Sequence, residues 1–177
     1  KTSAPTLLFF MILVACLQTP VATAILIPPT PPPPAELLWM DPIPTNDIAL
    51  SKDGQYVAAV GPAFSSVLAF YSRSGEIPIW TYIVADVFSS VAISADGSCV
   101  AAGNSSHVLF WNNAKSRTPG DTYPTWTSVD LGGPIGYRCL AISDNGNYVV
   151  AGGTGTNVYY WANAKSSDPS PVSPTWT

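Results

Sequence analysis

The stretch V-A-I-S-A-D-G-S-C-V-A-A-G at residues 91–103 decides the fold, because the chain contains it three times in related form. The other copies are I-A-L-S-K-D-G-Q-Y-V-A-A-V at residues 48–60 and L-A-I-S-D-N-G-N-Y-V-V-A-G at residues 140–152. The serines of successive copies are 43 and 49 residues apart. A period of that length indicates repeated supersecondary units.

Each copy predicts a β-hairpin followed by two further strands. Its turn is an Asp or Asn followed by Gly, and we expect both residues to take a positive φ there. In the second unit the predicted strands cover residues 90–94, 99–103 and 107–111, and residues 67–71 and 157–161 match the last of these. A tryptophan marks the fourth strand of each unit: Trp80, Trp126 and Trp176.

The predicted strands are almost continuously apolar, so both faces of each small sheet must be covered. Four-stranded sheets that stack face to face around an axis meet this requirement. We therefore predict an all-β fold, a β-propeller of four-stranded antiparallel blades, after an N-terminal signal helix. A β-sandwich is the fallback, since the repeat is too long for a β-helix coil.

The repeats divide the chain from residue 36 onward into three predicted blades, at residues 45–84, 85–130 and 131–177. Residues 36–44, with Trp39, resemble a fourth strand that has no unit of its own in front of it. The chain starts with Lys1, and its ending P-T-W-T repeats the middle of the second unit. We expect a fragment of a longer protein, with about three of the four to eight blades of a ring.

The N-terminal residues predict export. Lys1, an apolar run and an A-x-A ending indicate a signal peptide at residues 1–24, cleaved after Ala24. Two alternatives stay open: a lipid on Cys16, which ends a lipobox-like sequence, and an uncleaved membrane anchor that runs to Ile27. Each of the three places the rest of the chain outside the cytoplasm. The proline-rich residues 25–35 predict a semi-rigid linker.

The composition excludes one class of partner. The seven basic residues are scattered and the net charge is -4, so the chain lacks the basic patch of a nucleic-acid-binding protein. Contact with a membrane is expected only through the N-terminal anchor or lipid. A secreted or cell-surface protein is the expected outcome.

Two stretches resemble known propeller repeats. Residues 91–111 resemble the core of a WD40 blade, and residues 68–82 resemble a repeat of the quinoprotein-dehydrogenase-like (PQQ-type) propellers. The resemblance covers about residues 36–177. It implies an exported prokaryotic propeller of seven or eight blades, which in some relatives binds calcium and a quinone.

The chain departs from both families. The Trp-Asp pair of WD40 units is Trp111-Asn112 and Trp161-Ala162 here, and the structural histidine of those units is missing. The vicinal cysteines and axial carboxylates of quinoproteins are absent as well. The resemblance therefore supports the fold more strongly than any activity.

We predict no catalytic, cofactor-binding or metal-binding residue. Asp53, Asp96 and Asn145 are explained as turn formers, and none has the neighbouring oxygen ligands of a calcium loop. His107 is the only histidine, so the chain shows no nucleophile and base pair. The repeated tryptophans are expected in the core rather than on a sugar-binding platform.

Two modifications are considered. Asn104 begins the sequon Asn-Ser-Ser and is a candidate glycosylation site in a predicted exposed hairpin. Cys99 and Cys139 either form a disulfide across neighbouring repeats or serve as two small apolar residues.

These features together favour an exported, non-enzymatic propeller that binds or scaffolds proteins or surface polymers. The alternatives are the propeller portion of a quinoprotein-like dehydrogenase and the ectodomain of a sensor. Quinone-dependent dye reduction would distinguish the dehydrogenase, and a further membrane span would distinguish the sensor.

Overall fold

A computed structural model describes residues 34–61, 66–166 and 171–177. One compact unit spans Leu37–Thr177, and the other unit, Lys1–Glu36, contributes only residues 34–36 to the described part. The predicted signal peptide, the candidate lipidation site at Cys16 and most of the proline-rich linker therefore lie outside the described residues. Within those residues, no helix is long and apolar enough to span a membrane.

The first sheet has four antiparallel strands in the order β1-β2-β3-β4. They are β1 (Asp47–Leu50), β2 (Tyr56–Val60), β3 (Val67–Ser72) and β4 (Trp80–Ile83). Each strand pairs with the next one in the chain, as successive hairpins require. This is the four-stranded antiparallel unit that the sequence predicts.

The second sheet repeats the first. Its strands are β5 (Ser90–Ile93), β6 (Cys99–Gly103), β7 (Val108–Asn112) and β8 (Trp126–Thr127), again in chain order. A 3₁₀ turn, η1 (Ala114–Ser116), follows β7. The predicted all-β architecture is confirmed by this repetition.

The third sheet has three strands, β9 (Ile135–Ile142), β10 (Val149–Gly153) and β11 (Val158–Trp161), in the order β11-β10-β9. A second 3₁₀ turn, η2 (Ala164–Ser166), follows β11. In place of a fourth strand there is a single antiparallel bridge between Tyr160 and Trp176. The third unit thus keeps the topology with a shortened outer edge.

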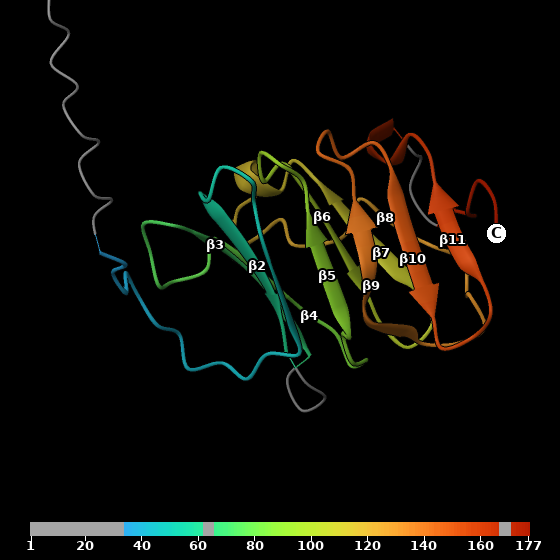
Figure 1. Ribbon diagram of the computed structural model, residues 1–177, viewed down its shortest axis with the longest axis horizontal. Helices are drawn as coiled ribbons and strands as arrows, with labels where there is room; N and C mark the ends of the chain where they lie inside the picture. Colours follow the sequence, from blue (N-terminus) through green and yellow to red (C-terminus); the bar gives the residue numbers. More distant parts are fainter. Residues whose placement is uncertain (1–33, 62–65, 167–170) are drawn as a thin grey trace, which may run out of the picture. The chain divides into compact units, whose positions relative to one another are not determined.

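The sheets pack face to face, and Figure 1 shows β5 and β9 side by side. Strand β6 illustrates the arrangement because all five of its residues are buried. Val100 and Ala102 join a core shared with the first sheet, whereas Cys99 and Ala101 join a core shared with the third. Both faces of the middle sheet are covered, as its continuous apolar sequence predicts.

The hairpin turns differ from the prediction in one respect. Among the described residues of the three turns, only the glycines take a positive φ: 69° at Gly54, 72° at Gly97 and 73° at Gly146. Asp96 does not, because it is a central residue of the four-residue turn that the hydrogen bond from Gly97 N–H to Ser94 O closes, and its Oδ1 accepts further hydrogen bonds from Ser98 N–H and Ser94 Oγ–H. The predicted pair of positive φ values was wrong for the Asp and Asn positions.

Residues 34–45 form no strand, so the outer strand expected at residues 36–44 is not present in the structure. No described strand lies alongside to pair with this backbone. Trp39 nevertheless packs on the first sheet, stacked on Tyr71 with a centroid distance of 5.2 Å. Ile43 packs against the same cluster of Ala59, Ala69 and Tyr71.

Candidate binding surfaces

The three Ser-x-Asp/Asn-Gly turns are built by the same hydrogen bonds. In the second turn, Ser94 Oγ donates to Asp96 and accepts from Cys99 N–H at 2.9 Å, while Gly97 N–H donates to Ser94 O. The equivalent bonds hold the first turn, with Ser51 and Asp53, and the third, with Ser143 and Asn145. These side chains close the turns.

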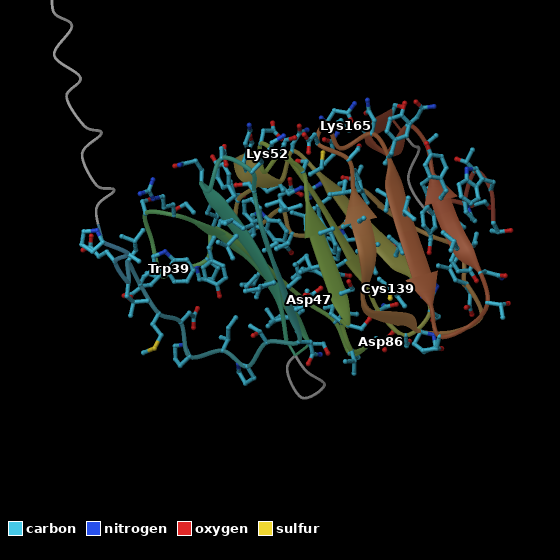
Figure 2. The ribbon with its side chains drawn as sticks, viewed as in Figure 1. Trp39, Asp47, Lys52, Asp86, Cys139 and Lys165 are labelled. Carbon is cyan, nitrogen blue, oxygen red and sulfur yellow. The ribbon has the colours of Figure 1, made fainter. Side chains whose placement is uncertain are left out.

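The turns also join neighbouring sheets. Lys52 N–H donates to Ala95 O at 2.9 Å, and Ala95 N–H donates to Asp144 O at 3.1 Å. The Lys52 ammonium forms an ion pair with the Asp144 carboxylate at 2.9 Å. Figure 2 shows Lys52 and Lys165 along the same edge of the sheets, away from Asp86 and Cys139. The first and third sheets thus meet at this rim through exposed charges, which add little stability.

Electrostatics at the rim agree with a structural role for the turn carboxylates. The hydrogen bond from Ser51 Oγ lowers the pKa of Asp53. Partial burial raises the pKa of Asp96. Hydrogen bonds from Ser98, Lys115 and Ser94 lower it by more than burial raises it, so the pKa lies well below its usual range. In the part of the chain that the structure describes, no three His, Cys, Asp or Glu residues are placed to hold a metal ion.

A second repeated motif, which the sequence reading missed, lies beside these turns. Asn-Ala-Lys-Ser occurs at residues 113–116 and again at residues 163–166. Asn113 and Asn163 take positive φ values of 55° and 58°, and the following alanines, Ala114 and Ala164, are fully buried. The identical tetrapeptides were the signal that could have revealed this turn.

The Asn-Ala-Lys-Ser turn receives a tryptophan from the preceding sheet. Trp80 Nε1–H donates to Ala114 O at 2.7 Å, and Trp126 Nε1–H donates to Ala164 O at 2.8 Å. We call this contact the indole clasp. Both tryptophans are almost completely buried, so the N–H group and the carbonyl group satisfy each other away from water.

Trp39 makes a third indole clasp, on the first sheet. Its Nε1–H donates to Arg73 O at 3.1 Å, and Arg73 N–H donates to Gln55 O. Ala114 makes the equivalent bonds in the second sheet, with Trp80 and Ser98. Trp39 therefore takes the place on the first sheet that an outer-strand tryptophan takes on each later sheet.

The first sheet lacks the Asn-Ala-Lys-Ser turn, and a groove lies at that end of it. Residues 73–79 connect β3 to β4, whereas the longer segment 113–125 connects β7 to β8. The groove has a volume of about 830 Å³ and lies between Trp39 and this short connection. We call it the sheet 1 groove; its lining comprises Leu38, Trp39, Gln55, Tyr56, Ser72, Arg73, Ser74, Gly75, Glu76 and Ile77.

Asn104, the candidate glycosylation site, has a structural role in the fold. It is 6% exposed, and its Oδ1 accepts hydrogen bonds from Ser106 N–H at 3.1 Å and His107 N–H at 2.8 Å. The carboxamide thus closes the turn before β7. Glycosylation at Asn104 stays a prediction from the sequence.

The other residues singled out by the sequence are not brought together. His107 is half-buried and its Nδ1 lies 3.1 Å from Ser106 Oγ. Cys99 is buried and Cys139 is exposed, and no disulfide joins them. Cys99 packs instead against the third sheet, where a Cβ added to Gly146 would lie 2.6 Å from its sulfur.

Comparison with known proteins supports the fold. No family model and no curated protein matches the sequence. Among solved structures, the chain is similar to the WD40 repeats of RRP9, with a TM-score of 0.59 and 14% identity. The match covers 77% of this chain and 41% of that one. With the repeated antiparallel sheets, this likeness shows a β-propeller fold of the WD40 type.

Proposed function

We propose that this chain forms part of an exported β-propeller that binds a protein or surface polymer, and that the sheet 1 groove contacts the ligand. The observation that carries the proposal is the groove itself. Its volume of about 830 Å³ lies within the range of ligand-binding clefts, about 300–1,000 Å³.

The lining of the groove suits an extended polymer. Trp39 and Tyr56 supply aromatic surface, while Leu38 and Ile77 are apolar residues that are 55% and 78% exposed. Exposed aromatic and aliphatic side chains that lie together in one patch mark interaction sites, whereas apolar residues that are exposed singly are common on any protein surface. An extended chain could lie between Leu38 and Ile77 and bury both.

Polar groups in the same groove favour a ligand with hydrogen-bonding groups along its length. Gln55, Ser72 and Ser74 offer an amide and two hydroxyls, and Arg73 and Glu76 place opposite charges on the lining. Peptides and polysaccharides carry such groups at regular intervals. The Ser72 and Ser74 hydroxyls bond each other at 3.0 Å and Gln55 Nε2–H donates to Asp53 O at 3.2 Å, so a polar ligand would use their remaining hydrogen-bonding capacity.

The walls of the groove are fixed before a ligand arrives. Trp39 is held by its indole clasp and by stacking on Tyr71, and Arg73 N–H is bonded to Gln55 O at 2.7 Å. Tyr56 stacks on Phe70 with a centroid distance of 5.5 Å. A preformed site loses less conformational entropy on binding than a mobile one.

Export of the propeller is supported by the sequence of residues 1–35. A signal peptide followed by a proline-rich spacer would place the folded sheets outside the cytoplasm and away from the membrane or wall. A ligand at the cell surface, either a protein segment or a polymer, is the corresponding class of partner.

The test measures binding of the full chain to a panel of extended peptides and cell-surface polysaccharides by biolayer interferometry. Leu38→Asp and Ile77→Asp place a charge in the groove, and Ile83→Asp is the matched control, because Ile83 is 72% exposed on β4 outside the groove. We expect each groove variant to weaken binding about tenfold or more. The control should bind like the unmodified chain.

Two results would contradict the proposal. One is a ligand of the panel that binds both groove variants as tightly as it binds the unmodified chain. The other is a panel in which no member binds the folded chain.

A further inference from the structure

The second sheet carries an additional extended segment on its outer edge. Val172 N–H donates to Thr127 O at 2.9 Å, and Val129 N–H donates to Val172 O at 3.0 Å. The two bonds form a parallel bridge between Val172 and Ser128. The last strand of a sheet has N–H and C=O groups that point away from its neighbour, and another segment can pair with them. The chain itself thus shows which backbone groups of a fourth strand accept such a segment.

The first sheet has the equivalent backbone groups on β4. Both β4 and β8 begin with the recurrent tryptophan. The residue after the tryptophan is Thr81 in β4 and Thr127 in β8. Two positions further along, Ile83 takes the place of Val129. The groups that correspond to the bonded pair on β8 are therefore Thr81 O and Ile83 N–H.

The ladder between β3 and β4 directs these groups outward. Val84 N–H donates to Ser66 O at 3.1 Å, which follows the register of the two strands. In an antiparallel pair, alternate residues of a strand bond the same neighbour, so Tyr82 also faces β3. Thr81 and Ile83 then direct their N–H and C=O groups away from β3. Among the described residues, β4 is the last strand of its sheet and no segment pairs with its outer side.

The connection that could cover β4 is held elsewhere. It belongs to the second unit, where Thr122 corresponds to Val172 when the two Asn-Ala-Lys-Ser turns are aligned. Thr122 O accepts the indole N–H of Trp111 at 2.8 Å. The next carbonyl, Tyr123 O, accepts from the Arg117 guanidinium at 2.7 Å. These bonds fix the connection within its own unit and leave the outer edge of β4 open.

The sequence around Val172 explains why its bridge is short. Residues 170–174 read Ser-Pro-Val-Ser-Pro. In a parallel pair, the next N–H to bond after that of Val172 belongs to residue 174 and would donate to Val129 O. Pro174 has no N–H, so the pairing ends there. A peptide without this proline can form one more bond, and β4 has four residues where β8 has two.

We propose that the outer edge of β4 binds an extended peptide of a partner protein, in parallel orientation and with a β-branched residue at its centre. The central N–H donates to Thr81 O, and the central C=O accepts from Ile83 N–H. The N–H two residues later donates to Ile83 O. In this mode of recognition, backbone pairing gives the affinity and alternate side chains give the specificity.

The side chains beside the edge favour an apolar residue at the centre of the peptide. Val172, which pairs with β8, packs against the core of the second and third sheets. Beside β4, the Tyr123 ring is 74% exposed and lies 6.2 Å from the ring of Tyr82. The site is distinct from the sheet 1 groove, whose lining includes no residue of β4.

The test titrates the isotope-labelled full chain with the synthetic peptide Ser-Pro-Val-Ser-Val-Thr and follows the backbone amides by NMR. The peptide copies residues 170–175 except that Pro174 is replaced by Val. We expect the Ile83 amide to shift and its exchange with solvent to slow, because its N–H becomes hydrogen-bonded. The peptide that keeps the proline should bind about threefold to tenfold more weakly, since it lacks one backbone hydrogen bond.

Two N-methylated peptides separate backbone pairing from binding through side chains alone. A methyl group on the nitrogen of the central valine removes the donor to Thr81 O and should weaken binding about tenfold or more. A methyl group on the nitrogen of the following serine replaces an N–H that points away from β4, so the affinity should stay within about twofold. Equal affinities for these two peptides would overturn the proposal.

A matched pair of protein variants tests the same bond from the other side. Ile83→Pro removes the outward N–H without breaking a bond to β3, as edge strands allow, and should abolish the binding. Ile83→Ala keeps the N–H and should retain it. Tight binding to a folded Ile83→Pro chain would contradict the proposal. If that variant does not fold, the N-methylated peptides on the unmodified chain still decide.

Other occupants and other sites give different results, each of which would overturn the proposal. Shifts confined to Thr127 and Val129 would mean that the peptide displaces the chain's own segment from β8. Shifts confined to the lining of the sheet 1 groove would place the peptide there. The absence of shifts at every soluble peptide concentration would leave the edge without this ligand. In sedimentation velocity, a dimer of the unmodified chain that Ile83→Pro dissociates would assign the edge to a second copy.

Discussion

Ser94 shows how a single hydroxyl can define a repeat. It is fully buried, accepts a hydrogen bond from Cys99 N–H and donates one to Asp96. The Asp96 carboxylate in turn accepts from Ser98 N–H, so one serine and one carboxylate satisfy the polar groups of a tight connection. Gly97 supplies the positive φ. Each residue of the motif has a different task in the same turn.

Replacing Ser94 by Ala removes the acceptor of a buried N–H group. We expect the free energy of unfolding to fall by about 1–2 kcal/mol, the cost of leaving such a group unsatisfied. Urea denaturation measures this change in the free energy of unfolding. The control variant is Ser116→Ala, because Ser116 is an exposed serine in η1. Equal midpoints for the two variants would show that the hydroxyl of Ser94 does not support the turn.

Asp96 makes the second turn sensitive to acid. Its pKa in the folded chain is below the usual value of about 3.9, so the ionised carboxylate stabilises the fold above that pH. This contribution is lost as the pH falls through the lower, folded-state pKa. In Asp96→Asn, which copies Asn145 of the third turn, the stability should depend less on pH below about 4. Parallel pH profiles for both proteins in thermal unfolding would refute this.

The strands were predictable because their signals are local. Apolar runs bounded by an Asp-Gly or Asn-Gly pair gave the hairpins, and the structure places them in the expected order. The left-handed conformation of Asn113, which precedes a carbonyl that bonds a neighbouring sheet, was not predicted. Ala114 must present its carbonyl to Trp80, and no spacing within one repeat reveals that requirement.

Trp39 shows a related limit on what the sequence can predict: its side-chain contact was predictable, but the conformation of its backbone was not. Its sequence context correctly placed it with the fourth-strand tryptophans, and it makes their indole clasp. A strand at residues 36–44 needs a neighbouring strand as well, and the sequence around Trp39 does not reveal whether one is there. The Trp39 side chain therefore makes the expected contact, although the backbone of residues 36–44 does not form a strand.

The turn glycines provide a test of how sheets meet. Gly54 and Gly97 have nearly the same φ, 69° and 72°, but an added Cβ meets nothing within 4 Å at Gly54 and meets the Tyr56 ring at Gly97. Gly54→Ala should cost about 1–2 kcal/mol from its conformation alone. Gly97→Ala should cost about 1–3 kcal/mol more, because it also forces Tyr56 to move.

Urea unfolding of the two variants gives the difference directly. Equal losses of stability would mean that Tyr56 does not cover Gly97. A larger loss for Gly54→Ala than for Gly97→Ala would contradict the packing of the first sheet on the second.

The whole molecule is a series of sheets in which each contacts mainly its neighbours. Repeat proteins of this kind owe their stability to the units and to the interfaces between them. Two apolar interfaces are described here, each with a buried tryptophan from the preceding sheet and an aromatic ring from the next. The exposed ion pair of Lys52 and Asp144 adds a link across the turn rim but little energy.

At the scale of the whole molecule, the sequence predicted the class of fold but did not reveal the groove that we propose as a binding surface. A repeat in the sequence identifies the residues that recur in each unit, such as Trp80 and Trp126. The sheet 1 groove instead arises where the repeat departs from itself, at the short connection of residues 73–79. The recurrent pattern gives no sign of such a position, because this connection does not recur in the later units.

The repeated interface can be tested most directly through its indole N–H groups. Exchange with D₂O, followed residue by residue by NMR on the 177-residue chain, separates clasped indoles from open ones. We predict slow exchange for Trp80 and Trp126, which are buried and bonded to Ala114 O and Ala164 O, and rapid exchange for Trp176. Rapid exchange of Trp80 and Trp126 in a chain that is otherwise folded would contradict the packing of the three sheets through one repeated contact.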